Sequence, residues 1–107
     1  MLNRKHAIAA LGSLLADPGR SSILMSLLDG GSLAAGELAR AAGVSPQSAS
    51  AHLAKLTSGG LVTARSEGRC RFYQLRSARV ACALEALGAI STIQAPVNTY
   101  VLKLTNR

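Results

Sequence analysis

Aromatic residues are scarce in this sequence, which has two tyrosines, one phenylalanine and no tryptophan among its 107 residues. The core must therefore be built from leucine, alanine, valine and isoleucine, and such a composition favours helices. The length allows one domain with a modest hydrophobic core. We assign residues 1–95 to this domain and treat residues 96–107 as a C-terminal tail of unknown role.

Acidic residues are also few, since five of them stand against twelve lysines and arginines and leave a net charge of +7. Five dispersed acids, without a glycine-rich phosphate loop or a nucleophile motif, do not suggest an active site. We therefore expect neither an enzyme nor a cofactor. The positive charge is clustered, because residues 55–79 contain six basic residues and a single acid, Glu67. Such a cluster suits a polyanion, most simply a phosphate backbone.

Long apolar runs are missing as well, and none approaches the roughly 18 residues of a membrane-spanning helix. The basic stretch Asn3 to His6 and the apolar residues after it resemble a signal peptide only weakly, because Gly12 and Ser13 interrupt them. We expect a cytoplasmic protein with no membrane partner. The two cysteines, Cys70 and Cys82, are too few for a disulfide framework.

Two short helical patterns, joined by a glycine-containing turn, occupy the centre of the chain. The first runs from Leu33 to Ala42, with Ser32 expected as its N-cap, and Gly43 ends it because glycine accepts the left-handed C-cap conformation. Ser45 is the next N-cap, and Pro46 suits the first position of the helix that follows. This arrangement predicts a helix-turn-helix, whose second helix enters the major groove of DNA.

The second of these helices divides into two faces at about 100° per residue. Ala49, Leu53 and Leu56 form an apolar face, and the opposite face is small and polar with one cation. Glutamine can bond adenine, serine can bond several base edges, and alanine can contact a thymine methyl group. We predict that this helix contacts DNA through Gln47, Ser48, Ser50, Ala51, His52 and Lys55. The simpler alternative is a solvated face, and His52 is also expected to pack beside the core.

A β-hairpin is predicted directly after this helix, with strands over Leu61–Ser66 and Cys70–Leu75 and a short turn containing Gly68. A hairpin in this place is called a wing. We expect Arg65, Arg69 and Arg71 to contact phosphates or the adjacent minor groove. The alternative is that these arginines only keep a sheet edge soluble.

Further helices are predicted over Arg4–Leu15, residues 20–28 and Ser77–Ile93. The fold class is therefore mainly α with a small β-hairpin (α+β), a winged helix-turn-helix of about five helices and a two-stranded wing. Both the first and the last helix carry an apolar stripe, which one small domain cannot bury completely. We expect a homodimer that binds a palindromic operator in double-stranded DNA.

Several of these motifs, taken in order, resemble the ArsR/SmtB family. The residues that carry the resemblance are Leu15–Arg20, Glu37–Ala39, Val44–Ser45, His52–Leu56, Gly59–Val62 and Glu67–Leu75. The resemblance covers about residues 5–92. It implies a small dimeric repressor whose terminal helices form the dimer and which leaves its operator when an effector binds. The effector is unidentified.

Many members of that family sense metals, through cysteines on the first helix of the helix-turn-helix or through Asp, His and Glu ligands on the last helix. Residues 37–42 contain no cysteine, and residues 77–93 offer no such ligand set. Because zinc requires about four donors held together, we predict no metal site.

Alternatives stay open for the role of the two cysteines and for that of the whole domain. Cys70 and Cys82 are either two small buried residues or a thiol sensor, in which the neighbouring Arg69 and Arg71 favour a thiolate at Cys70. The whole domain could instead be a winged-helix protein–protein interaction module. The arginine-rich wing and the small polar helix face argue against that module, because protein interfaces favour aromatic and methionine anchors.

Overall fold

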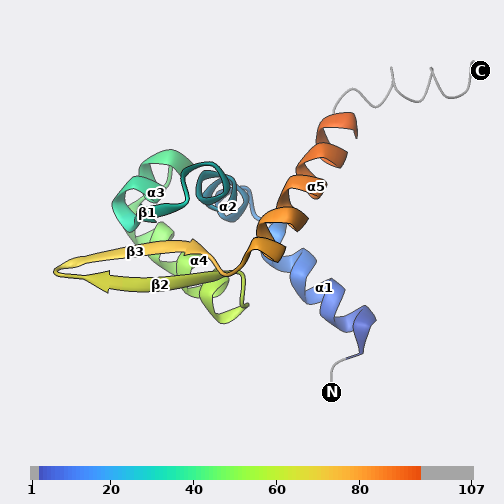
Figure 1. Cartoon of the computed structure of the whole chain (residues 1–107), viewed down its shortest axis with the longest axis horizontal. Coiled ribbons are helices and arrows are strands. Elements are labelled where there is room, and N and C mark those ends of the chain that lie inside the picture. Colours follow the sequence, from blue (N-terminus) through green and yellow to red (C-terminus); the bar gives the residue numbers. More distant parts are fainter. Residues whose placement is uncertain (1–2, 95–107) are drawn as a thin grey trace, which may run out of the picture.

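The computed structural model describes residues 3–94. Within them the elements are, in order, α1 (Arg4–Leu15), α2 (Pro18–Gly30), β1 (Ser32–Ala34), α3 (Ala35–Ala42), α4 (Pro46–Ser58), β2 (Val62–Glu67), β3 (Cys70–Leu75) and α5 (Ala78–Gln94). The helices and the projecting β2–β3 hairpin (Figure 1) confirm the predicted winged helix-turn-helix. The predicted C-terminal tail and residues 1, 2 and 95 of the assigned domain lie outside the described residues.

Side-chain caps determine where the first two helices begin. The Asn3 side chain accepts a hydrogen bond from the Lys5 amide at 2.7 Å and so caps α1. Asp17 caps α2 in the same way, accepting from the Arg20 amide at 3.1 Å, and Pro18 takes the first helical position. The second helix therefore starts two residues earlier than predicted, and it also continues two residues further, to Gly30.

The segment before α3 differs from the prediction. Ser32–Ala34 is not the start of a helix but the short strand β1, which pairs antiparallel with β3 and places Leu33 opposite Tyr73. The strand order is β1-β3-β2, so the wing continues into a three-stranded sheet. At the start of α3, the Glu37 carboxylate accepts from the Ala34 amide at 3.0 Å, in place of the expected Ser32 cap. Three residues are too few to show the alternation that marks a strand.

The wing and the last helix follow the prediction closely. Glu67 pairs with Cys70, which leaves a two-residue turn in which Gly68 has a φ of 63°, a conformation that glycine accepts readily. The β3 strand has the predicted bounds, and β2 is shifted by one residue. The Ser77 hydroxyl accepts a hydrogen bond from the Val80 amide at 3.3 Å, as expected of an N-cap.

The hydrophobic core lies between α2, α3, α4 and the base of the wing. Its largest fully buried side chains are aliphatic, as predicted: Ile23, Leu24, Leu27, Leu38, Leu53, Leu56 and Val62. In contrast, α1 contributes no buried residue, and Leu84 is the buried hydrophobic residue of α5 within the described part of the chain. Both helices extend away from this core at the end of the molecule opposite the wing tip (Figure 1).

Candidate nucleic-acid interface

A short turn sets α4 against α3. Gly43 has left-handed backbone angles (φ 67°, ψ 34°), and its amide donates to carbonyls in the last turn of α3. The Ser45 hydroxyl accepts a hydrogen bond from the Ser48 amide at 3.1 Å, and Pro46 occupies the first helical position. These are the predicted features, and together they build the helix-turn-helix.

The α4 helix separates its buried and exposed residues by face. Ala49, Leu53 and Leu56 are at most 1% exposed and join the core. The other face is open to solvent and presents an amide, two hydroxyls, a methyl group and an ammonium group. Its exposed residues are Gln47, Ser48, Ser50, Ala51 and Lys55, which are five of the six positions predicted on this helix. Such groups match the donors, acceptors and methyl groups of base edges and phosphates.

His52, the sixth position, turns inward instead. Its side chain is 18% exposed, and its Nε2 lies 3.5 Å from an oxygen of Asp17. On the other side of the ring, Nδ1 lies 3.5 Å from Nη1 of Arg20. The hydrogen bond from the Arg20 amide lowers the pKa of Asp17, against a smaller opposing effect of desolvation, so the carboxylate beside the imidazole stays ionised at neutral pH. The ring therefore packs beside the core, as also expected, and does not point outward with the other five residues.

A polar groove of about 380 Å³ lies between α4 and the wing. Ser50, Thr57 and Ser58 line it from the helix, and Arg71 and Tyr73 line it from β3. The Arg71 guanidinium carbon is 5.9 Å from the centre of the Tyr73 ring, within cation–π range. The Thr57 hydroxyl already donates to the Leu53 carbonyl at 2.7 Å, so the donors in the groove that suit phosphate oxygens are the Ser50 and Ser58 hydroxyls and the Arg71 guanidinium. Thr57 and Ser58 were not among the predicted residues, although their spacing from Ser50 marks one helical stripe.

The arginines of the wing do not share one face. Successive side chains of a strand point to opposite faces, so Arg71 lies on the α4 side whereas its neighbour Phe72 lies on the other. Arg65 is paired with Phe72 in the sheet, and its guanidinium carbon is 5.2 Å from the centre of that ring. The same guanidinium is 3.0 Å from the Glu67 carboxylate. Arg69 is exposed in the turn at the wing tip.

Known proteins resemble this chain in both sequence and fold. Residues 15–65 match a family described as a helix-turn-helix domain. The chain is 41% identical over 96 residues to the HTH-type transcriptional regulator CmtR of Mycobacterium tuberculosis, and the match covers 90% of this chain and 78% of CmtR. It is 49% identical over 80 residues to the uncharacterized HTH-type transcriptional regulator YdfF of Bacillus subtilis. That match covers 75% of this chain but 35% of YdfF, so the chain spans about a third of this relative.

The fold also matches a solution structure from Mycobacterium bovis, the homodimeric winged helix-turn-helix DNA-binding domain of Mb0332, described as a possible ArsR-family transcriptional regulator. The TM-score is 0.77 at 32% identity, and the match covers 89% of this chain and 91% of that one. The chain belongs to the ArsR family. It is accordingly a DNA-binding transcriptional regulator and not an enzyme, as the sequence predicted.

The two cysteines of this ArsR-family chain are both exposed, so their interpretation as small buried residues is wrong. Cys70 begins β3 at the wing tip, whereas Cys82 belongs to α5 at the opposite end of the molecule (Figure 1). A disulfide needs Cα atoms within about 7 Å of each other, so the two residues cannot join within one chain in this fold. A thiol sensor confined to one chain would therefore have to use each cysteine singly.

The described residues of this ArsR-family chain contain neither a cluster of metal ligands nor a membrane-spanning helix. Their His, Cys, Asp and Glu side chains form no group of three that could hold a metal ion. The helices in the same part of the chain include none that is both long and apolar enough to span a membrane. The absence of metal regulation stays a prediction.

Proposed function

We propose that this ArsR-family protein is a dimeric repressor that binds a palindromic operator in double-stranded DNA and is released by an effector. In this proposal Gln47, Ser48 and Ala51 read base edges in the major groove. Arg69 at the wing tip contacts a phosphate or the adjacent minor groove. A second set of residues holds the phosphate backbone: Ser50, Lys55 and Arg71.

One observation supports this assignment most strongly. The exposed face of α4 carries no large apolar side chain, and it borders a groove whose opposite wall carries the cation Arg71. A helix face that binds another protein would be expected to carry aromatic or methionine anchors. Small polar groups flanked by positive charge are instead what a groove of DNA and its phosphates require.

The remaining predicted residues have weaker roles in this proposal. His52 supports α4 from behind, because both of its ring nitrogens face α2. Arg65 is paired with Glu67 and lies on the wing face away from α4. Its contribution to phosphate binding should therefore be smaller than that of Arg71.

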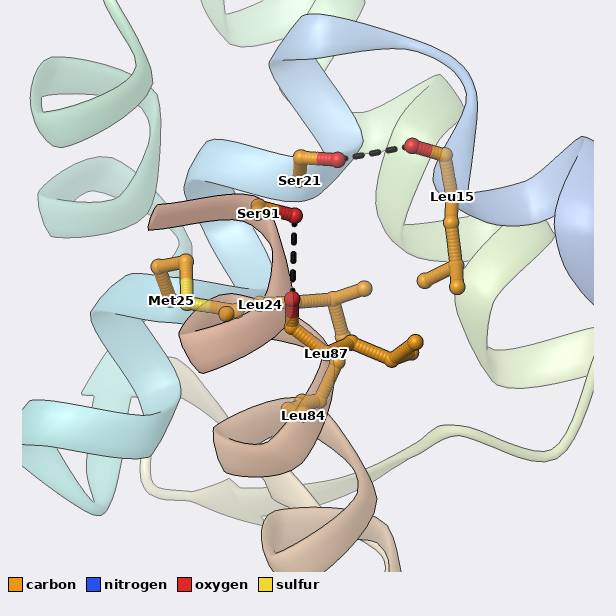
Figure 2. A pocket seen from close by; sticks show the side chains of 8 residues that line it. Leu15, Ser21, Leu24, Met25, Leu84, Leu87 and Ser91 are labelled. Carbon is orange, nitrogen blue, oxygen red and sulfur yellow. Dashed lines mark hydrogen bonds between the residues drawn. The ribbon is translucent and has the colours of Figure 1, made fainter. Parts of the chain in front are cut away.

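Dimerisation is supported by an apolar, hollowed surface at the end formed by α1, α2 and α5. Two of its exposed side chains are Ile8 (63%) and Ile90 (50%). A hollow of about 380 Å³ lies between α2 and α5, and Figure 2 shows Met25 and Leu87 among the side chains that line it. A second hollow of about 330 Å³ lies between α1 and α5.

Both serine hydroxyls in the first hollow already donate hydrogen bonds to backbone carbonyls. The Ser21 hydroxyl donates to the Leu15 carbonyl at 2.7 Å, and the Ser91 hydroxyl donates to the Leu87 carbonyl at 2.9 Å. The lining is therefore mainly apolar, and its best partner is another apolar surface. A second copy supplies a matching surface by two-fold symmetry, and this symmetry accounts for a palindromic operator.

Salt-dependent DNA binding tests the proposal directly. The wild-type protein would first enrich duplexes from a random-sequence library, and its affinity for the best duplex and for a scrambled duplex would then be measured against salt concentration. We expect tighter binding to the enriched duplex and a logarithmic salt slope of about −0.9 for each phosphate contact. Failure to enrich any duplex, or binding that salt does not weaken, would instead favour the protein–protein interaction module.

Repression and release follow from the same proposal. A dimer that occupies its operator blocks transcription without needing a further activity, and an effector that binds the DNA-free form more tightly shifts the equilibrium towards release. The protein should act in the cytoplasm, where bacterial DNA is located. Genome-wide mapping of the bound sites would identify the regulated genes and indicate the class of effector.

A further inference from the structure

The Arg20 guanidinium joins three helices. Arg20 belongs to the first turn of α2, and its Nε donates to the Leu14 carbonyl at 2.8 Å while Nη2 donates to the Ser13 carbonyl at 3.1 Å. These carbonyls lie in the last turn of α1, where no intrahelical partner is available. Its Nη1 lies 3.5 Å from Nδ1 of His52, on the inner side of α4. A single side chain thus contacts the end of α1 and the back of the recognition helix.

Both nitrogens of the His52 ring have partners. A guanidinium only donates hydrogen bonds, so a hydrogen bond between Arg20 and the ring requires Nδ1 as the acceptor. Nε2 in turn lies 3.5 Å from the Asp17 carboxylate, so both ring nitrogens face polar groups at the start of α2. The fit is close, because a Cβ added at Gly19 would lie 2.8 Å from Nε2. The ring therefore rests directly on the first turn of α2.

The His52 contacts restrict the rotation of α4 more closely than its apolar face does. Burial of Ala49, Leu53 and Leu56 fixes which face of the helix meets the core, but it resists small rotations of the helix only weakly, because the hydrophobic effect has no preferred direction. Polar contacts depend on angle as well as distance, so the His52 contacts restrict rotation of α4 about its own axis. Further along α4, Leu14 of α1 packs so closely on Gly59 that a Cβ there would collide with it.

We propose that Arg20 and His52 are positioning residues that fix the orientation of α4 relative to α1. The inference rests on the proposed function, because α1 helps to form the dimer and α4 enters the DNA. In a two-fold dimer, the angle between α1 and α4 determines the separation and rotation of the two recognition helices. The contact therefore sets the half-site spacing that the protein selects, although neither residue touches DNA.

The test compares affinities for operators that differ only in spacing. The reference duplex is the one enriched by the wild-type dimer, and two further duplexes have one base pair inserted or deleted between the half-sites. Each change rotates one half-site by about 35°, since a turn of DNA contains 10–10.5 base pairs. The wild type should prefer the original spacing by at least about tenfold. His52→Leu fills part of the space of the ring with an apolar side chain and removes both polar contacts, and it should reduce this preference to about threefold or less.

Matched variants separate positioning from loss of folding. His52→Gln retains a donor and an acceptor and should recover most of the spacing preference. Arg20→Lys keeps the charge but loses the planar fork that reaches α1 and α4 together, so it should lower the preference. Lys55→Ala, which removes a proposed phosphate contact, should weaken binding to all three duplexes by the same factor. A merely destabilised protein would likewise lose affinity on all three without changing their ratio.

A folded, dimeric His52→Leu protein with the wild-type spacing preference would overturn the inference. If that variant does not fold, an Arg20→Lys dimer whose spacing preference is unchanged would overturn it instead. A wild type that binds DNA but accepts all three spacings equally would also refute it. Failure of the wild type to bind any duplex would refute the proposed function first and this inference with it, so the two failures are distinguishable.

Discussion

Replacing Leu87 and Ile90 together with alanine should separate the two protomers and leave each protomer folded. These side chains are 42% and 50% exposed on α5, so the single chain depends on them only in part. Leu84, one turn earlier, is 4% exposed and belongs to the protomer's own core. A change at Leu84 would therefore confuse loss of folding with loss of association.

The expected magnitude follows from the surface that these residues leave uncovered. Complete burial of a leucine or isoleucine side chain is worth about 1.5–3 kcal/mol, and Leu87 and Ile90 each leave about half of their surface exposed in the protomer. In a two-fold symmetric dimer every lost contact occurs twice, and alanine retains a small part of the apolar area. The double variant should therefore weaken the dimer by about 2–5 kcal/mol, or roughly 30- to 4,000-fold in Kd.

Sedimentation velocity from nanomolar to micromolar concentration measures this change, and circular dichroism checks that the protomers are folded. The matched comparison is Leu84→Ala, which should lower the free energy of unfolding of the protomer by about 2–5 kcal/mol. A double variant that associates as tightly as the wild type would refute the assignment of this surface. So would a wild type that sediments as a monomer at micromolar concentration.

Three further predictions concern the DNA contact, metals and pH. Gln47→Ala should cost about 1–3 kcal/mol on the best operator and relax preference at one or two base pairs, whereas Arg71→Ala should weaken all sequences alike and reduce the salt slope by about one. Arg65→Ala should change that slope less, because its guanidinium is paired with Glu67 on the other face; affinity against salt on cognate and scrambled duplexes measures all three variants. Titration of zinc, cadmium or arsenite into the operator complex should not release the protein, and release that survives replacement of both cysteines would reveal an overlooked ligand set. The pKa of Asp17 is lowered in the fold from its ordinary value of about 3.8, so the ionised carboxylate stabilises the folded protein at any pH above that value. This stabilisation disappears as the pH falls through the lower pKa of the folded state. Asp17→Asn keeps a capping side chain but does not titrate, so thermal melts below about pH 4 should show the wild type losing stability relative to this variant.

Local chemistry was sufficient to predict much of the fold from the sequence. The caps at Ser45 and Ser77 and the turn at Gly68 each depend on residues within a few positions of one another, and the structure confirms them. The strand β1 could not be found in this way. It consists of three residues, and its partner β3 lies far along the chain, so only tertiary pairing makes it a strand.

The candidate site was predictable to a similar extent. The exposed face of α4 follows from helical periodicity, which the sequence displays directly. The opposite faces of Arg65 and Arg71 were not predicted, because the predicted strands enclose a three-residue turn, which would place Arg65 opposite Arg71. The observed turn has two residues and pairs Arg65 with Phe72 instead, and a shift of one residue reverses the face of a side chain. The contact between His52 and Arg20 was not predicted either, since the two residues are 32 positions apart and their meeting depends on how α2 packs against α4.

The division of α4 into two faces has a consequence for evolution. The residues that hold the helix in the core are Ala49, Leu53 and Leu56, and the proposed base-reading residues Gln47, Ser48 and Ala51 are all exposed. Exposed substitutions usually change stability by no more than about 0.5 kcal/mol. A duplicated copy of this gene could therefore acquire a new operator through one or two substitutions, without compensating changes elsewhere in the fold. Divergence of regulatory targets is then limited by the DNA sites available, and not by the stability of the protein.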